Sequence, residues 1–249
     1  SLSNDTDSVN IFYKIDPSQF FSFLNQLGEF IKASNDDSNI KICCLKILSK
    51  LEKVKIESSE FLLNSIYFSL SNIFNDDSLV RYFAALSSSS LISHIKENDV
   101  EIKSQIFEST PIIEKMNDLF SVFFELERDY QTQMITESLK KIIFFFGDKI
   151  QPFLLQISNE VIELFFRFAS NSENNEPSIL LASILCKLIE IAEGDPQFSA
   201  FVLKYLLNEE YISCINYPIA FDKLFDIFTS LVYYSTEFLE DFCSIVPLL

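Results

Sequence analysis

The sequence predicts an all-α protein built as a stack of helix pairs, and three observations carry this prediction. The segment Asn35–Lys41 recurs 40 residues later as Asn75–Arg81, with the same Asn-Asp-Asp-Ser opening followed by a β-branched residue and a cation. A period of that size is typical of helical repeat proteins. Six of the 7 prolines, at positions 17, 111, 152, 177, 196 and 218, stand where an apolar period begins, as prolines at helix starts do. Only 3 glycines leave too few turn formers for a sandwich, a barrel or a doubly wound sheet.

In such a stack each helix pair buries its apolar face only against its neighbours. We therefore expect a right-handed superhelical solenoid of about five helix pairs over residues 17–249, after a frayed N-terminal segment over residues 1–16. The chain begins without Met and ends in Val246-Pro247-Leu248-Leu249, so it is also expected to be a fragment of something longer.

The first two predicted helices follow capping residues. Asp16 and Pro17 suit the N-cap and the first turn of a helix that carries Phe20, Phe21, Leu24, Leu27 and Ile31 at helical spacing. The second helix follows the polar loop Ser34–Ser38, where Asp and Ser would cap its free N–H groups. Its buried face is predicted to hold Ile40, Cys44, Leu45, Leu48 and Leu51.

The middle of the chain continues the pattern. A third helix, from about Ser58 to Phe74, is expected to pair with the second, and the next runs from Ser78 to Ile95. Lys96–Ser109 has few apolar anchors and is predicted to be a longer connection with a short helix. Thr110-Pro111 would open a helix through about Leu126, closed by a charged loop over Glu125–Asp129.

The last third is punctuated most clearly. From about Thr132 a helix carries the apolar stripe Ile135, Leu139, Ile142, Ile143 and Phe146, and Gly147 should end it. Gln151-Pro152 begins the next helix. The helix that Pro177 opens, to about Glu193, is apolar on nearly every side and should be central. Further helices are expected from Pro196, from Pro218 and from about Thr236 to Val246.

The composition limits the partners of the protein. The 36 acidic and 19 basic residues give a formal net charge of −17, which argues against direct nucleic-acid binding, since phosphate contacts need a basic patch. Basic proteins are the natural counterpart. The alternative interpretation is that the acidic residues keep a chain with 27 phenylalanines soluble.

The sequence offers no catalytic, cofactor or metal site. His94 is the only histidine and is expected to be structural or half-exposed inside a helix, beside a serine run that favours close helix packing. The cysteines are odd in number and without a repeated ligand spacing, so they are expected to be reduced thiols: Cys43, Cys44, Cys186, Cys214 and Cys243. No apolar run reaches membrane length, so no membrane insertion is expected.

Five stretches and the closing Val-Pro-Leu-Leu carry a family resemblance: Ile40–Glu52, Asn75–Leu86, Glu137–Ile157, Leu181–Pro196 and Phe221–Leu231. Taken in order, they resemble the middle of an importin-β superfamily karyopherin, in the subgroup of importins seven and eight. The pattern Asp-x-x-[Ile/Val]-[Lys/Arg]-x-x-[Ala/Cys] after each repeat opening also resembles the first-helix signature of HEAT repeats. The resemblance covers most of the chain from Ile40 onward.

The resemblance implies a HEAT-repeat receptor, ARM-like in its helical architecture, that carries protein cargo through nuclear pores and shuttles between nucleus and cytoplasm. Its implied partners are the Ran GTPase, bound through the full-length chain, nucleoporins and a cargo. Because the chain is acidic, the cargo is expected to be basic, and its candidate contacts are Asp36, Asp37, Asp76, Asp77, Glu173 and Glu176. Helix capping is the competing role for these aspartates. A HEAT-repeat scaffold of the phosphatase-subunit or vesicle-coat type is the alternative function.

Overall fold

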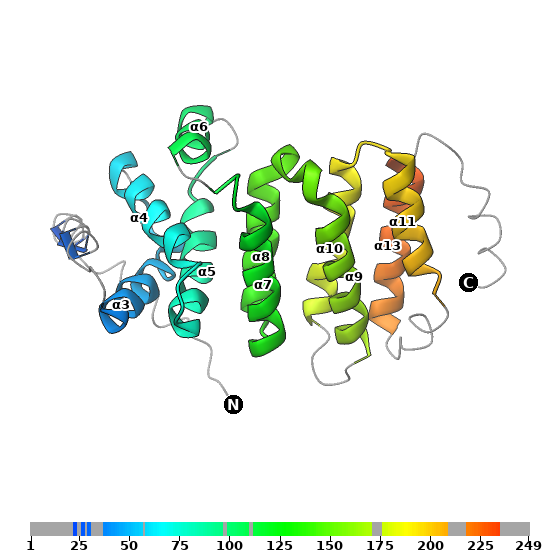
Figure 1. The fold of residues 1–249 in the computed structure, drawn as a ribbon, viewed down its shortest axis with the longest axis horizontal. Coiled ribbons are helices and arrows are strands. Elements are labelled where there is room, and N and C mark those ends of the chain that lie inside the picture. Colours follow the sequence, from blue (N-terminus) through cyan, green and yellow to red (C-terminus); the bar gives the residue numbers. More distant parts are fainter. Residues whose placement is uncertain are drawn as a thin grey trace. The chain divides into compact units, whose positions relative to one another are not determined.

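The computed structural model describes residues 22–23, 26–27, 29–30, 37–56, 58–96, 99–109, 112–170, 176–208 and 218–234. The regular structure in these residues is helical, and they contain no strand (Figure 1). The all-α class is thereby confirmed for the described part of the chain. The chain divides into two compact units, Ser1–Ile112 and Ile113–Leu249.

The first unit is organised around one helix that carries a run of small residues. It contains α3 (Ser38–Leu48), the 3-10 turn η1 (Leu51–Lys53), α4 (Ser59–Asn72), α5 (Ser78–Ile92) and α6 (Val100–Ser109). Both α3 and α4 pack on α5, and α6 contacts α4. The predicted pairing of the third helix with the second is therefore wrong, because each of them uses α5 as its main partner.

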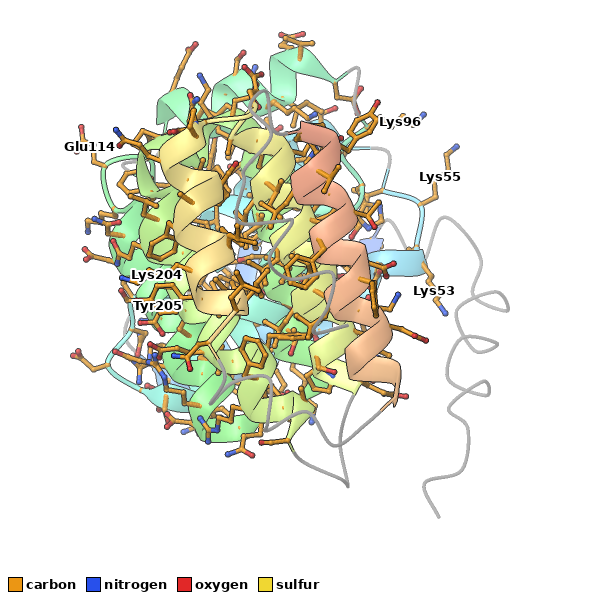
Figure 2. The ribbon with its side chains drawn as sticks, turned by 90° about the vertical axis from the view of Figure 1, so that its right-hand side faces the viewer. Lys53, Lys55, Lys96, Glu114, Lys204 and Tyr205 are labelled. Carbon is orange, nitrogen blue, oxygen red and sulfur yellow. The ribbon has the colours of Figure 1, made fainter. Side chains whose placement is uncertain are left out.

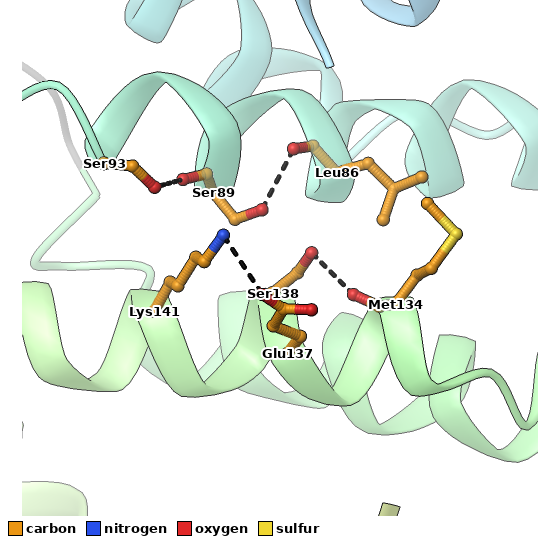
Figure 3. A network of polar contacts seen from close by, with 7 residues as sticks. All are labelled: Leu86, Ser89, Ser93, Met134, Glu137, Ser138 and Lys141. Carbon is orange, nitrogen blue, oxygen red and sulfur yellow. Dashed lines mark hydrogen bonds and ion pairs between the residues drawn. The ribbon is translucent and has the colours of Figure 1, made fainter. Parts of the chain in front are cut away.

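The small side chains of α5 explain this arrangement. The run from Ala84 to Ser90 is buried. It consists of alanine and serine except for Leu86, and such small side chains let neighbouring helices approach closely. Ser87 Oγ donates to Ser69 Oγ of α4 at 2.9 Å, and Ser90 Oγ donates to the Leu48 carbonyl of α3 at 3.4 Å. The hydroxyls of Ser89 and of Ser93, the residue that follows α5, donate to carbonyls about one turn earlier (Figure 3). The serine run thus packs closely without leaving these hydroxyls unsatisfied.

Helices α3 and α5 are the two copies of the 40-residue repeat, and they run in the same direction. Contacts between them follow the same order along both segments: Lys46 Nζ lies 5.9 Å from the Phe83 ring centroid, Ser90 bonds Leu48, and the His94 ring bonds Leu51. The equivalent ends of the two copies therefore lie at the same end of the first unit.

The second unit places three helices in a row. It contains α7 (Met116–Tyr130), α8 (Gln133–Phe146), the 3-10 segment η2 (Gly147–Phe153), α9 (Leu154–Ala169), α10 (Glu176–Ile191), α11 (Pro196–Leu206) and α13 (Pro218–Tyr234). Helix α10 packs against α8 on one side and α13 on the other, as well as against α9. Helix α7 packs on α8 and α11 on α9. Figure 2 shows α11 and α13 on opposite sides of the unit. The central position predicted for the Pro177 helix is confirmed.

Most local signals predict the observed boundaries. Gly147 ends α8 at φ +50°, a backbone conformation that suits glycine, and the five residues of the predicted α8 stripe are all buried. Asp195 caps α11 and Pro196 is its first residue. Ile40 departs from its predicted buried face: it is 40% exposed, because the first turn of α3 leaves one side of the helix open.

The predicted bounds of α7 are wrong at both ends. Residues 112–115 form turns, and the helix begins at Met116 rather than near Thr110. It continues to Tyr130, through the segment predicted to be a charged loop. Leu126 and Glu127 are buried there, while Glu125 and Arg128 are exposed on the outer face of an amphipathic helix. The helix ends at Gln131 in the left-handed conformation, φ 48°.

Two smaller corrections concern helix ends. Pro152 lies inside η2, and α9 begins two residues later, at Leu154. Helix α5 ends at Ile92 rather than Ile95. The predicted frayed segment 1–16, most of the first helix and the final helix Thr236–Val246 lie outside the described residues.

Candidate interaction surface

The repeated acidic openings cap helices with the same geometry. Asp37 Oδ1 accepts the Asn39 and Ile40 amides at 2.8 and 3.4 Å, and Asp77 Oδ1 accepts the Leu79 and Val80 amides at 2.9 and 3.4 Å. Each carboxylate satisfies amides that have no partner inside the helix and lies at the positive end of the helix dipole. The sequence repeat is therefore a repeated N-cap.

Capping leaves some acidic side chains exposed. Asp76 is exposed beside the cap of α5, and Glu176 is the exposed first residue of α10. Because α3 and α5 run in the same direction, Asp37, Asp76 and Asp77 lie at the same end of the first unit. Glu176 belongs to the second unit. Asp36 and Glu173, the other two candidate cargo contacts, lie outside the described residues.

His94 connects two elements of the first unit. It lies just beyond α5, not inside the helix as predicted, and it is half-buried. Its Nε2 is 2.9 Å from the Leu51 carbonyl oxygen. Burial lowers the pKa of the His94 imidazole, while the bond to Leu51 and the charge of Glu52 act in the opposite direction. The ring thus has the structural, half-exposed role that the sequence predicts.

The described residues include no group of three or more His, Cys, Asp or Glu side chains that could hold a metal ion. Of the cysteines in this part of the chain, Cys43 is exposed, Cys44 buried and Cys186 half-buried. Burial raises the pKa of the Cys44 and Cys186 thiols. None of the helices described here is long and apolar enough to cross a membrane.

A groove crosses the row of helices in the second unit. Its volume is about 520 Å³, and it opens over α8, α10 and α13. We call it the α8–α10–α13 groove. It is lined by Lys140, Ile179, Leu180, Ala182, Ser183, Cys186, Lys223, Asp226, Thr229 and Ser230. These residues come from three segments far apart in the sequence, and no sequence motif predicts that they lie together.

The lining combines apolar and hydrogen-bonding groups. Helix α10 contributes the apolar side chains Ile179, Leu180 and Ala182. On α13, the Thr229 and Ser230 hydroxyls donate to the backbone carbonyls of Phe225 and Asp226, at 2.8 and 3.1 Å. Their oxygens keep lone pairs that can accept hydrogen bonds from a ligand.

Lysines stand on both sides of the groove. Lys223 of α13 is paired with Asp226, while Lys140 of α8 has its ammonium 5.5 Å from the centroid of the Phe144 ring. Phe144 is 44% exposed, and a second cation, Lys187 of α10, lies 5.7 Å from the same ring. Such cation–π contacts hold the two lysines over the exposed aromatic side chain.

The neighbouring surface of α8 has its own polar contacts. Lys141 pairs with Glu137 at 3.4 Å, and the Ser138 hydroxyl donates to the Met134 carbonyl at 2.8 Å (Figure 3). The i,i+4 ion pair adds only a few tenths of a kcal/mol to the helix, about 0.3–0.5.

Sequence reasoning did not identify Glu127 as a buried acid, because its segment was predicted to be a loop. Glu127 of α7 is fully buried, and Thr136 Oγ1 of α8 donates to its Oε1 at 2.9 Å. Its Oε2 has no hydrogen-bond partner among the described residues. Burial raises the pKa of Glu127 to about 7, although the Thr136 bond and the charge of Arg167 act in the opposite direction. A carboxyl with this pKa changes its charge near neutral pH.

The chain matches no protein family model, no curated protein and no solved structure.

Proposed function

We propose that this chain binds proteins and forms part of a nuclear transport receptor of the importin-β type. The observation that carries the proposal is the row α8, α10 and α13, in which consecutive helix pairs present one helix each to a common surface. Stacked helix pairs provide extended binding surfaces in proteins whose function is to hold other proteins. The groove lies on this row.

The sequence resemblance supports the receptor assignment. The stretches that carry it coincide with helices: Ile40–Glu52 spans α3 and η1, Asn75–Leu86 covers most of α5, and Glu137–Ile157 runs from α8 through η2 into α9. Leu181–Pro196 and Phe221–Leu231 fall on α10 and α13. The resemblance thus follows the helices in chain order, as expected if the chain is a segment of one helical repeat stack.

Basic proteins are the proposed cargo. The net charge of −17 provides long-range attraction, and Asp37, Asp76 and Asp77 present negative charge at one end of the first unit. A side chain that caps a helix through one carboxylate oxygen can still attract a cation through the other. Ran, bound through the full-length chain, would control release, and nucleoporins would mediate passage between nucleus and cytoplasm.

Affinity capture with the full-length protein tests this proposal. Captured proteins should be basic, and addition of Ran loaded with GTP should change which of them stay bound. GDP-loaded Ran is the matched control. If the bound set is the same with both nucleotides, the receptor assignment fails. A stable multisubunit complex that is indifferent to Ran would favour the scaffold alternative.

A further inference from the structure

We propose that the α8–α10–α13 groove binds an acidic amphipathic helix of a partner protein. This site is separate from the proposed cargo contacts, because none of them lines the groove and because the groove is proposed to select the opposite charge. The inference rests on the shape of the groove, the cations on both sides of it and the exposed aromatic side chain next to it.

The floor of the groove suits apolar side chains. Ile179 and Leu180 are only half-buried, and the neighbouring positions on α10, Ala182 and Ser183, are small and leave a depression between the flanking helices. Helices that dock in such grooves insert apolar residues spaced three and four positions apart. The described residues contain no strand, and therefore no sheet edge to which an extended peptide could add.

The row also sets the length of the partner. Packed helices lie about 8–10 Å apart, so the path from α8 across α10 to α13 is about 16–20 Å. A helix rises 1.5 Å per residue, and about 11 to 13 residues would cover this path. A partner helix of about three to four turns is therefore long enough to contact all three helices.

The charges of the lining select acids. The lining has two lysines, Lys140 and Lys223, and one acid, Asp226; because Lys223 and Asp226 are paired with each other, Lys140 carries the excess positive charge. Among the described residues, the contact found for Lys140 is with the face of the Phe144 ring, which leaves its ammonium hydrogens available to a carboxylate. Lys187 of α10 is held over the same ring, and its ammonium is paired with Glu190 at 2.6 Å.

Phe144 gives the partner an apolar anchor beside these cations. The ring lies one turn after Lys140 on α8 and is 44% exposed. Large aromatic side chains that become buried in an interface often contribute much of its binding energy. A helix with apolar residues on one face and glutamates along its borders would satisfy Phe144, the groove floor and the lysines together.

The test uses a fluorescent 18-residue helical peptide with Leu at i, i+3, i+4 and i+7 spacing and Glu at the flanking positions. A second peptide has Lys in place of each Glu. Binding to the 249-residue chain is followed by fluorescence anisotropy. Thr229→Trp fills the groove from an exposed position, and Lys140→Glu reverses one of its charges. Lys204→Glu, exposed on α11 (Figure 2), makes the same change in net charge away from the groove.

We expect the acidic peptide to bind, and its Kd to rise about tenfold or more in Thr229→Trp and in Lys140→Glu but not in Lys204→Glu. Circular dichroism and melting identify variants that unfold, and Lys140→Met is the second variant if Lys140→Glu does. Absence of acidic-peptide binding, or binding equally strong in Thr229→Trp, overturns the proposal. So does a groove that responds to the basic peptide instead. A dimer that Thr229→Trp abolishes in analytical ultracentrifugation would assign the groove to a second copy and also overturn it. Since none of these readouts involves Ran or cargo, failure here is distinguishable from failure of the receptor assignment.

Discussion

The buried carboxyl of Glu127 should make the stability of this protein fall as pH rises toward neutrality. Its pKa is raised from 4.5 to about 7 in the folded state. The folded state therefore holds a proton that the unfolded state has released over that range. The contribution of Glu127 to the free energy of unfolding is therefore largest below about pH 4.5, declines between pH 4.5 and about 7, and stays constant at higher pH.

The size of the effect follows from the shift. Each pKa unit corresponds to about 1.36 kcal/mol, so the displacement from 4.5 to about 7 is worth about 3 kcal/mol in total. Most of it, about 2 to 3 kcal/mol, is lost between pH 5 and pH 8.

Glu127→Gln removes the titration and keeps an oxygen that can accept the Thr136 bond. The free energy of unfolding of the variant minus that of the original chain should be about 2 to 3 kcal/mol larger at pH 8 than at pH 5. Urea unfolding at pH 5, 6, 7 and 8 measures this, followed by far-ultraviolet circular dichroism because the chain has no tryptophan. Glu125→Gln, exposed on the same helix, is the control and should change little. If the two variants show the same pH dependence, the assignment of the titration to Glu127 is refuted.

Three further predictions follow from the described contacts. Leu185→Asp should destabilise the second unit by several kcal/mol, because Leu185 is fully buried on α10. Thermal unfolding tests this prediction, with Leu155→Asp, at an exposed position of α9, as the control. Equal melting temperatures of the two variants would contradict it. Asp77→Ala should cost about 1 kcal/mol through loss of the α5 N-cap, whereas Asp77→Asn should cost little; urea midpoints distinguish the two, and an equal loss in both would show that charge, not capping, is the source. If the acidic openings attract basic cargo, replacing their four aspartates by Asn should lower the cargo affinity of the full receptor and the salt dependence of that affinity without changing its stability. The residues to replace are Asp36, Asp37, Asp76 and Asp77. An unchanged cargo affinity would show that they act only as helix caps.

Local chemistry explains why much of the fold was predictable from the sequence. A helix cap depends on atoms within three residues, so the repeat opening, Asp195-Pro196 and Gly147 could be interpreted without knowing any neighbour. The apolar stripe of α8 likewise predicts which face of this helix is buried, because the helical period is fixed by backbone geometry. The helical class and most helix positions follow from these signals alone.

Tertiary structure decided what depends on partners. That α4 packs on α5 rather than α3 follows from the small side chains of α5, which accept helices on two sides. Glu125–Asp129 is helical because Leu126 is buried by tertiary packing, which outweighs the charge-rich local composition. The same packing buries Glu127, and the groove exists only where α8, α10 and α13 meet. Sequence periodicity determines which face of a helix is apolar, but only the packing of distant segments determines what covers that face and what it leaves open.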